Sequence, residues 1–477
     1  MSQFRAKKLD LSGFINARII RDHTKRMVFA ENEPERQALR YISHNTSLPM
    51  RVRAQAQLKL SQMHAYTRPS QIKNRCIGGG IARGVFRDFK LARYQFRMQA
   101  LAGDLPGVRK AKDLPKDPVF PANLKQLGYF INDKDEIRMI SNPEEKFLYK
   151  INANERYNEL QKEAMNTCIR NIVLSRLHDQ GLETLRLPLG AKANEQHVPI
   201  LVSPTFKTDE RIIAVFGEPV QDLGIWAYRI IGHETINSGS AVDFSAAVLR
   251  EKGESPTPGL ILTNPGQLVW HCAGEKAISL PSWLALPRKH AVEPPMKMTV
   301  RNKIPGHETW QDHVTYVFDE VLGKLAPDAK IDIIGLAEGS LAAVRYLAEH
   351  WSTWKSCISS MALGNPLHDM NHLHPTEFAE FISTRCRAYL ISDKELGQPV
   401  AGRYEYSCNC YSSGESKNVE CIIPRAYESM LKWLDDMHDK PELKETEVFV
   451  SEDFGSAESG EEFGDSNGNG AIVEELN

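Results

Sequence analysis

The chain has 477 residues, a length that predicts two or three domains. Hydrophobic residues make up 42% of it, which excludes a wholly disordered protein. The net charge of −2 conceals an asymmetry, because residues 1–115 hold 23 Lys and Arg against 8 Asp and Glu, whereas the remainder holds 36 against 53. Such a division is typical of a nucleic-acid-binding module joined to an unrelated domain.

The eight cysteines are scattered and form no C-x-x-C pair, which predicts free thiols in a reducing compartment. Cys408 and Cys410 form a lone C-x-C, which we interpret as alternating residues of a strand rather than as a metal site. No apolar run reaches membrane-spanning length and no secretory signal is visible, so we expect no membrane partner. The basic residues of segment 1–30 fit a mitochondrial presequence and an RNA-binding arm equally.

Three helices are predicted in the basic part, at about 33–43, 49–63 and 89–102. The three consecutive glycines at 78–80 predict a loop between the second and third helices. On the third helix Lys90, Arg93 and Arg97 follow the spacing i, i+3 and i+7, which places them on one face.

Segment 73–110 combines this Gly-rich loop with a cationic helix, an arrangement suited to the phosphate oxygens of folded RNA. Aromatic residues at 86, 89, 94 and 96 lie between the cations and either stack on bases or form the small core. For Phe89 and Phe96 we favour the core. The predicted RNA-binding residues are Lys73, Arg75, Arg83, Arg87, Lys90, Arg93, Arg97, Arg109 and Lys110.

Several motifs at fixed spacing connect this segment with a known family. They are Asn74-Arg75-Cys76, Arg83-Gly84-Val85, Phe89-Lys90-Leu91, Arg97 and Leu105-Pro106-Gly107-Val108. Over residues 30–111 the chain resembles the universal small-subunit ribosomal protein family numbered fourteen, in its mitochondrial branch. The resemblance implies a place in the head of the small subunit, with ribosomal RNA and neighbouring small-subunit ribosomal proteins as partners.

Some members of that family carry a zinc ribbon, and its four ligand positions correspond here to Cys76, Gly79, Ala92 and Gln95. One thiolate cannot hold a tetrahedral zinc ion, so we expect neither a metal nor another cofactor. The loop must then be held by packing and by RNA.

The chain continues past Ala111, where members of the family usually stop, into the Pro-rich linker 111–122. Either two genes are fused, or two adjacent reading frames have been joined. We predict a ribosomal module at 1–114, an α/β domain at 115–440 and an acidic, disordered tail at 441–477.

Beyond the linker, apolar strands alternate with amphipathic helices. This alternation predicts a mostly parallel sheet covered by helices. The expected strands are 198–203, 211–217, 267–272, 296–300, 331–335, 358–363 and 386–392. The expected helices are 154–177, 308–325, 339–351 and 425–438.

The strand at 331–335 and the helix after it have the pattern of a nucleophile elbow, G-x-S-x-G. Here the pattern reads Gly335-Leu336-Ala337-Glu338-Gly339, and an alanine methyl group cannot attack a carbonyl. Ser340 lies a helical turn further on and is interpreted as a capping or packing residue. Asp393 occupies a plausible acid position, but the only later histidine, His438, lies beside the tail. We therefore predict no catalytic residues.

Two other polar groups have weaker patterns. His368, Asp369, His372 and His374 follow a strand and suit either a metal site or an ordinary polar loop, of which we favour the loop. His271 and Cys272 end a strand where a hydrolase would place its oxyanion loop, and a buried strand end explains them as well.

Residues 120–438 resemble the Argonaute-binding-protein-two (Arb-two) domain family, through the stretches FPANLKQLGYFINDKDEIRMI, LVWHCAG, IPGHETWQDHVTYVFDEV and DIIGLAEGSLAAVRYL. The resemblance implies an α/β-hydrolase-like fold and a non-catalytic partner in RNA-silencing or heterochromatin complexes. The sequence thus predicts a mitochondrial ribosomal protein with an inert extension. The alternatives are a nuclear or cytoplasmic scaffold that binds proteins through the α/β domain, and a hydrolase with another nucleophile.

Overall fold

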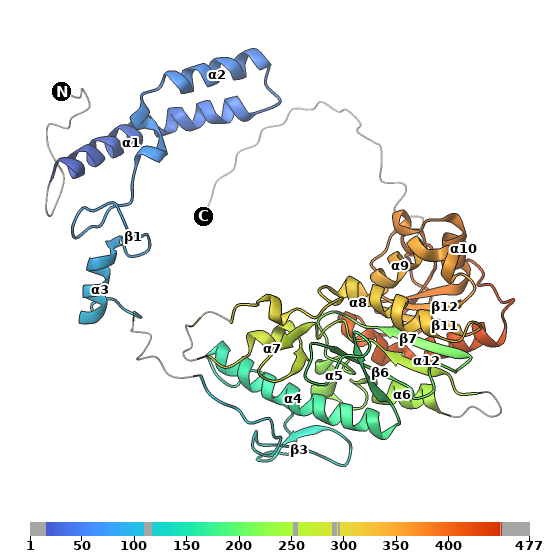
Figure 1. The fold of residues 1–477 in the computed structure, drawn as a ribbon. Coiled ribbons are helices and arrows are strands. Elements are labelled where there is room, and N and C mark those ends of the chain that lie inside the picture. Colours follow the sequence, from blue (N-terminus) through green and yellow to red (C-terminus); the bar gives the residue numbers. More distant parts are fainter. Residues whose placement is uncertain are drawn as a thin grey trace, which may run out of the picture. The chain divides into compact units, whose positions relative to one another are not determined.

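The computed structural model describes residues 16–108, 117–250, 256–288, 293, 296–448 and 450. The chain forms two compact units, residues 1–115 and residues 116–477 (Figure 1). The predicted RNA-binding residues Arg109 and Lys110 lie outside the described residues, as does most of the acidic tail.

The first unit begins with two helices, α1 (Ala17–His44) and α2 (Met50–Gln62), which contact each other along a helical hairpin (Figure 1). The side chain of Asn16 caps α1 by accepting hydrogen bonds from the backbone amides of Arg18 and Ile19. This helix begins well before the predicted start at residue 33 and continues through Pro34. Two short 3-10 helices, Ala65–Thr67 and Pro69–Gln71, lead into the Gly-rich loop.

A small hairpin replaces the first turn of the predicted third helix. Strand β1 (Val85–Phe86) pairs with β2 (Leu91–Ala92), and helix α3 (Arg93–Ala102) follows at once and ends at Gly103. The helix predicted from residue 89 is therefore wrong in its first four residues, since Lys90 lies in the hairpin turn with φ of +52°. Only Arg93 and Arg97 share a face of α3.

The second unit is built on an eight-stranded sheet. Its spatial order is β14 (Asn409–Ser412), β13 (Cys386–Leu390), β12 (Ile358–Gly364), β11 (Lys330–Leu336), β7 (Arg211–Phe216), β8 (Gly259–Leu262), β6 (Val198–Val202) and β5 (Glu183–Leu187). From β14 to β8 neighbouring strands are parallel, and β6 is antiparallel to both of its neighbours. The sheet is thus mostly parallel, as predicted.

Helices cover both faces of this sheet (Figure 1). On β7, Ile213 and Val215 pack toward α4, α6 and α12, whereas Ile212, Ala214 and Phe216 pack toward α8, α9 and α10. Because both faces are buried, the central strands are continuous apolar runs. The helices are α4 (Glu155–Asp179), α5 (Tyr228–His233), α6 (Ala241–Leu249), α7 (Leu280–Leu284), α8 (Trp310–Tyr316), α9 (Glu338–Trp354), α10 (Thr376–Arg385), α11 (Arg403–Tyr406) and α12 (Ile422–Asp439).

Two predicted strands lie outside the main sheet. The strand expected at 267–272 is β9 (Val269–His271), which pairs with β10 (Lys276–Ile278) in a separate hairpin. The strand expected at 296–300 is wrong: Met296 and Met298 are about half exposed, and the segment runs into the 3-10 helix Val300–Asn302. A further hairpin, β3 (Tyr129–Ile131) with β4 (Ile137–Met139), was not predicted.

The segment after α12 is partly ordered, in contrast to the tail predicted from residue 441. Glu445 accepts a hydrogen bond of 2.8 Å from Arg387 on β13, and Asn409 on β14 bonds the backbone of Thr446. Residues 441–448 therefore belong to the folded unit. Among the helices that the structure describes, none is both long and apolar enough to cross a bilayer.

Candidate functional site

The Gly-rich loop of the first unit is a compact, hydrogen-bonded turn. The amide of Cys76 donates to the carbonyl of Ile81 at 2.9 Å, and the amide of Gly80 donates to the carbonyl of Cys76 at 2.8 Å. The buried side chains of Cys76 and Ala92, two of the four zinc-ligand positions of the family, pack in the same apolar cluster. Apolar contacts thus hold these two positions together.

A third ligand position lies beside these two. A Cβ atom added to Gly78 would be 3.7 Å from Cγ of Gln95 and 3.9 Å from Sγ of Cys76. Residues 76, 92 and 95 therefore still converge, although only one of them carries a thiol. Within the described residues no three metal-ligating side chains come together.

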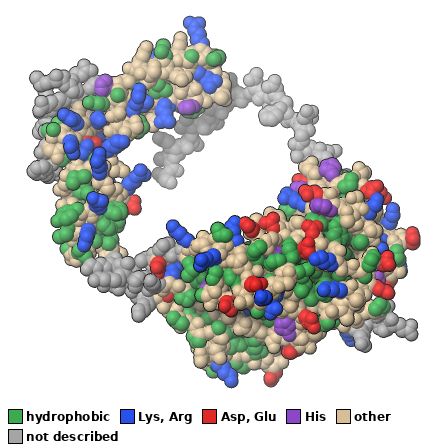
Figure 2. Space-filling model, viewed as in Figure 1, with side chains coloured by type: hydrophobic (Ala, Val, Ile, Leu, Met, Phe, Trp, Pro, Cys, Tyr) green, Lys and Arg blue, Asp and Glu red, His purple; other side chains and the backbone are tan. Residues whose placement is uncertain are grey.

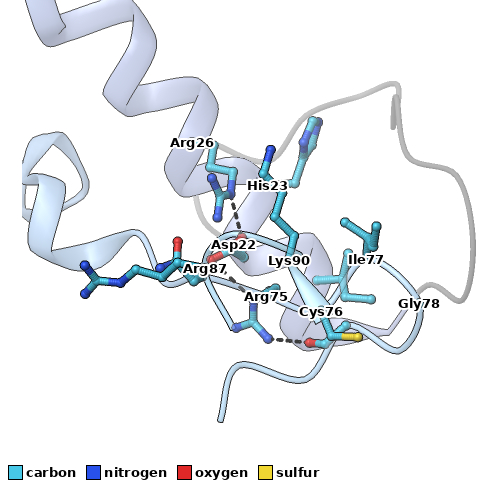
Figure 3. A pocket seen from close by; sticks show the side chains of 12 residues that line it. Asp22, His23, Arg26, Arg75, Cys76, Ile77, Gly78, Arg87 and Lys90 are labelled. Atoms are coloured by element: carbon cyan, nitrogen blue, oxygen red, sulfur yellow. Dashed lines mark hydrogen bonds and ion pairs between the residues drawn. The ribbon is translucent and has the colours of Figure 1, made fainter. Parts of the chain in front are cut away.

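The loop is attached to α1 through a buried aspartate. Asp22 is only 6% exposed and forms ion pairs with Nε of Arg26 at 2.8 Å and with Nε of Arg75 at 3.3 Å. Arg75 in turn donates from Nη1 to the carbonyl of Gly80 at 2.8 Å. In Figure 3, Arg26 and Arg75 both point toward Asp22. The guanidinium of Arg75, a predicted RNA-binding residue, is therefore used inside the module.

Two further contacts fix the loop. Gly80 has φ of +66°, which favours glycine, and a Cβ at this position would lie 2.4 Å from Cδ1 of Ile19, so a larger residue would require the Ile19 side chain on α1 to shift. The amide of Ile77 donates to the carbonyl of Lys90 at 2.9 Å. The loop thereby connects α1 with the turn of the β1–β2 hairpin.

The other predicted RNA-binding residues in the described part have free side chains. All are exposed, and none makes a side-chain hydrogen bond or ion pair with another described residue: Lys73, Arg83, Arg87, Lys90, Arg93 and Arg97. Figure 2 shows Lys and Arg side chains in excess on the visible face of this unit, whereas both signs alternate on the second unit. The hairpin, the loop and α3 thus present unneutralised positive charge.

The aromatic side chains divide between core and surface. Phe96 is half-buried against the apolar cluster, and its ring centroid lies 4.6 Å from that of Phe86 and 5.0 Å from that of Phe89. Tyr94, in contrast, is 67% exposed on α3. The core role that was favoured for Phe96 agrees with its position, whereas Phe89 packs on it from the surface.

The second unit retains the backbone of a nucleophile elbow. Ala337, between β11 and α9, has φ of +47° and ψ of −116°, a conformation that L-residues rarely adopt. A Cβ on Gly335 would lie 2.7 Å from Cα of Ser340, and one on Gly339 would lie 2.4 Å from the carbonyl oxygen of Gly217. The two glycines therefore still serve the sharp turn, although the residue at its tip has no nucleophile.

No other candidate triad residue is placed to act at this elbow. Ser340 lies in the turn, but it is fully buried and donates its hydroxyl to the carbonyl of Ala337 at 2.6 Å. Burial and the nearby Arg211 lower the pKa of His438, so this histidine lies near the first residue of β7, at the end of the strands opposite to the elbow. Asp393 is exposed beyond β13.

A carboxyl group that the sequence did not single out lies next to the elbow. Glu218 follows β7 in the segment whose Gly217 carbonyl contacts Gly339. Burial, with smaller contributions from Glu338 and Glu420, raises the pKa of Glu218 to about 7. In its ionised form this group would repel the negative charge that an oxyanion hole must stabilise.

The remaining candidates lie apart from the elbow. His271 ends β9, which lies outside the main sheet. The interpretation of His271 and Cys272 as part of an oxyanion loop is therefore wrong. The segment that packs on the elbow is the one that follows β7. His372 pairs with Asp369 at 2.9 Å, while Nε2 of the buried His368 lies 3.0 Å from the carbonyl of Tyr406. These contacts belong to an ordinary polar loop.

Together, these observations define a chain of two classes of domain. One is a small basic module with a thiol at only one of the four expected metal-ligand positions, and the other is an α/β-hydrolase-like domain with alanine at the nucleophile position. Comparison with protein families gives the same division: the model for ribosomal protein S14p/S29e matches residues 59–112 and that for the Arb2 domain matches residues 120–396.

Each of the following relatives matches one of the two parts of the chain. Small ribosomal subunit protein uS14m of Neurospora crassa is 68% identical over 111 residues, which cover 23% of this chain and 98% of that protein. The cotranscriptional regulator ARB2A homolog of Xenopus tropicalis is 23% identical over 357 residues, 70% of this chain and 83% of that protein. A histone deacetylase structure from Saccharomyces cerevisiae matches with a TM-score of 0.34 and 15% identity, values too low to support an argument. The chain belongs to the S14 ribosomal protein family through its N-terminal part and to the Arb2 domain family through residues 120–396.

Proposed function

We propose that this chain is a structural protein of the mitochondrial small ribosomal subunit, which binds ribosomal RNA in the head region and carries an Arb2 domain that performs no chemistry. The observation that carries the proposal is the set of exposed cations on the hairpin and α3 that have no partner among the described residues. Unneutralised Lys and Arg side chains gain binding free energy by replacing the counterions of RNA phosphates. The near full-length match to a uS14m protein supports the mitochondrial ribosome as the location.

Sedimentation of the tagged full-length protein in mitochondrial lysates tests this function. We expect the protein to migrate with small-subunit particles and to leave them when the particles are dissociated. A protein that stays in the soluble fractions at every salt concentration would contradict the proposal.

We further propose that the two domains act as one polypeptide in mitochondria. An immunoblot against each domain should then detect the same band at 53.8 kDa. Two smaller bands, each recognised by one antibody, would show that the domains are separate proteins.

The second candidate function is a nuclear or cytoplasmic scaffold that binds protein partners through the Arb2 domain, as in RNA-silencing or heterochromatin complexes. It is favoured by the relatives of that domain, which are named cotranscriptional regulators. Nuclear localisation of the tagged chain would favour this function, and exclusive co-localisation with mitochondrial ribosomes would contradict it.

A further inference from the structure

The predicted RNA-binding set contains one member that cannot present its charge to RNA. Arg75 is held between the carboxylate of Asp22 and the carbonyl of Gly80, and its side chain is only 21% exposed. Asp22 itself is an acid in a segment dominated by cations, where an isolated buried carboxylate would be unfavourable without a partner. Its burial with Arg26 and Arg75 indicates a structural task.

These contacts run from α1 to the exposed cations of the hairpin. Asp22 fixes Arg75, Arg75 fixes the carbonyl of Gly80, and the turn 76–81 is closed by its own backbone hydrogen bonds. Ile77 of that turn then binds the carbonyl of Lys90. Lys90 has φ of +52°, which a lysine adopts only where its surroundings hold it.

The same elements enclose a hollow of about 330 Å³ (Figure 3). Cationic side chains line it from both sides. Arg26 comes from α1, where its Nε pairs with Asp22 and its Nη2 donates to the carbonyl of Lys73. Arg87 and Lys90, whose side chains have no partner among the described residues, come from the hairpin. Asp22, the only acid among the lining residues, is neutralised by Arg26 and Arg75. Such a hollow suits a phosphate of an RNA backbone.

We propose that Asp22 is a positioning residue for RNA binding, which replaces the missing metal by holding the loop and thereby the hairpin turn from which Arg87 and Lys90 bind a backbone phosphate beside the hollow. This inference rests on the proposed RNA-binding function. It extends the set of residues on which RNA binding depends to α1, which lies outside the residues matched by the S14 family model.

The variant Asp22→Asn tests the inference through the sign of its effect. Electrostatics alone predicts tighter RNA binding, because one negative charge is removed from a cationic surface. The positioning role predicts weaker binding, by about fivefold at 0.1 M salt, because the preformed phosphate contacts are lost. Glu33→Gln is the matched control: it makes the same charge change on an exposed residue of α1 and should leave affinity within about twofold.

The experiment uses the full-length chain and a transcript of the mitochondrial small-subunit ribosomal RNA. Amide exchange is measured on the same proteins without RNA, and the amides of Cys76, Ile77 and Gly80 should exchange faster in Asp22→Asn while those of α1 and α2 remain protected. Unchanged exchange, or equal or tighter RNA binding by Asp22→Asn, would overturn the positioning role. Absence of RNA binding by the unaltered protein would instead contradict the proposed function.

A rescue variant separates positioning from general destabilisation. Cysteines at Gly79, Ala92 and Gln95, added to Asp22→Asn, would complete the ligand set around Cys76. We expect Zn²⁺ to restore loop protection and RNA affinity in this variant and to leave Asp22→Asn alone unchanged. If zinc binds stoichiometrically but the affinity for RNA does not return, Asp22 does not support RNA binding by holding the loop.

Discussion

At the scale of single residues, Glu218 predicts a specific dependence of stability on pH. Its pKa is about 7 in the folded state against 4.5 for an ordinary glutamate, because burial disfavours the carboxylate. A raised folded-state pKa means that stability is fully present below pH 4.5 and is lost as the pH rises toward 7. Glu218→Gln should therefore stabilise the second unit by about 2 kcal/mol at pH 8.

Urea unfolding of the unaltered chain and of Glu218→Gln at pH 5 and pH 8 measures this effect. The two proteins should differ little at pH 5, where the unaltered carboxyl is protonated in the folded state. Equal stability at pH 8 would show that the carboxylate is solvated. Glu338→Gln serves as the control and should change the stability less, because Glu338 contributes less than burial does to the raised pKa of Glu218.

The exposed arginines of the hairpin give the second prediction at this scale. Neither Arg83 nor Arg87 has a partner among the described residues, so both are available to phosphate. The double variant Arg83→Ala, Arg87→Ala should weaken RNA binding and reduce the slope of log K against log salt by about two. Arg40→Ala with Arg51→Ala, which removes two exposed cations beside the α1–α2 turn, should change the slope less. An unchanged slope in the first variant would mean that those arginines do not contact phosphate.

The sequence predicts which residues carry charge, but it does not predict which of them form ion pairs within the protein and which remain available to RNA. Arg75 and Arg83 are equivalent in a pattern of cations around glycines, and only the tertiary contact of Arg75 with Asp22 distinguishes them. Similarly, the spacing of Lys90 and Arg93 fits a helix, whereas the pairing of Phe86 with Leu91 forces Lys90 into a turn. The available signal for the buried ion pair was Asp22, an acid that stands between Arg21 and Arg26 in the sequence.

At the scale of elements, the elbow is a turn whose glycines are required by packing. A Cβ on Gly335 would meet the backbone of Ser340 at 2.7 Å, and backbone cannot rotate away as a flexible side chain can. Gly335→Ala should therefore destabilise the second unit by about 2–4 kcal/mol in urea unfolding. Gly217→Ala is the control, since a Cβ there meets no atom within 4 Å, and it should cost less than about 1 kcal/mol. Similar losses in the two variants would contradict this account.

Restoring the missing nucleophile tests whether the residues around the elbow can support ester hydrolysis. Ala337→Ser would place a hydroxyl on the strained turn, but His438, the histidine that follows Asp393 in the chain, cannot accept its proton, since it lies near Arg211 at the amino end of β7, whereas the elbow follows the carboxyl end of β11. We expect no gain in ester hydrolysis over the unaltered chain in a broad substrate screen. Turnover that appears with Ala337→Ser and is lost when Glu218 is changed to Gln would show that this carboxyl acts as the base.

Long apolar strands were predictable from the sequence, and short or edge strands were not. Strands β7, β11 and β12 are buried on both faces and appear as continuous apolar runs, which is why their limits were close to those observed. Edge strand β5 has the sequence ETLRL and β14 has the sequence NCYS, so neither has a distinctive pattern. Their positions are set by pairing with β6 and β13, the strands beside them in the sheet.

At the scale of the whole molecule, the division of charge has consequences for RNA binding. The chain forms two compact units. Residues 1–115 carry a net charge of +15, and the remainder carries a net charge of −17. A fragment of residues 1–115 should therefore bind RNA more tightly than the full chain at low salt, because the acidic part tethered to it repels the RNA. The two affinities should converge at about 0.3 M salt, where charges more than about 6 Å apart are screened.

Residues 116–477 should fold alone and bind no RNA. Titrating one RNA transcript with all three proteins at several salt concentrations checks this. A full chain that binds more tightly than the fragment at low salt would show that the Arb2 domain contributes contacts to RNA.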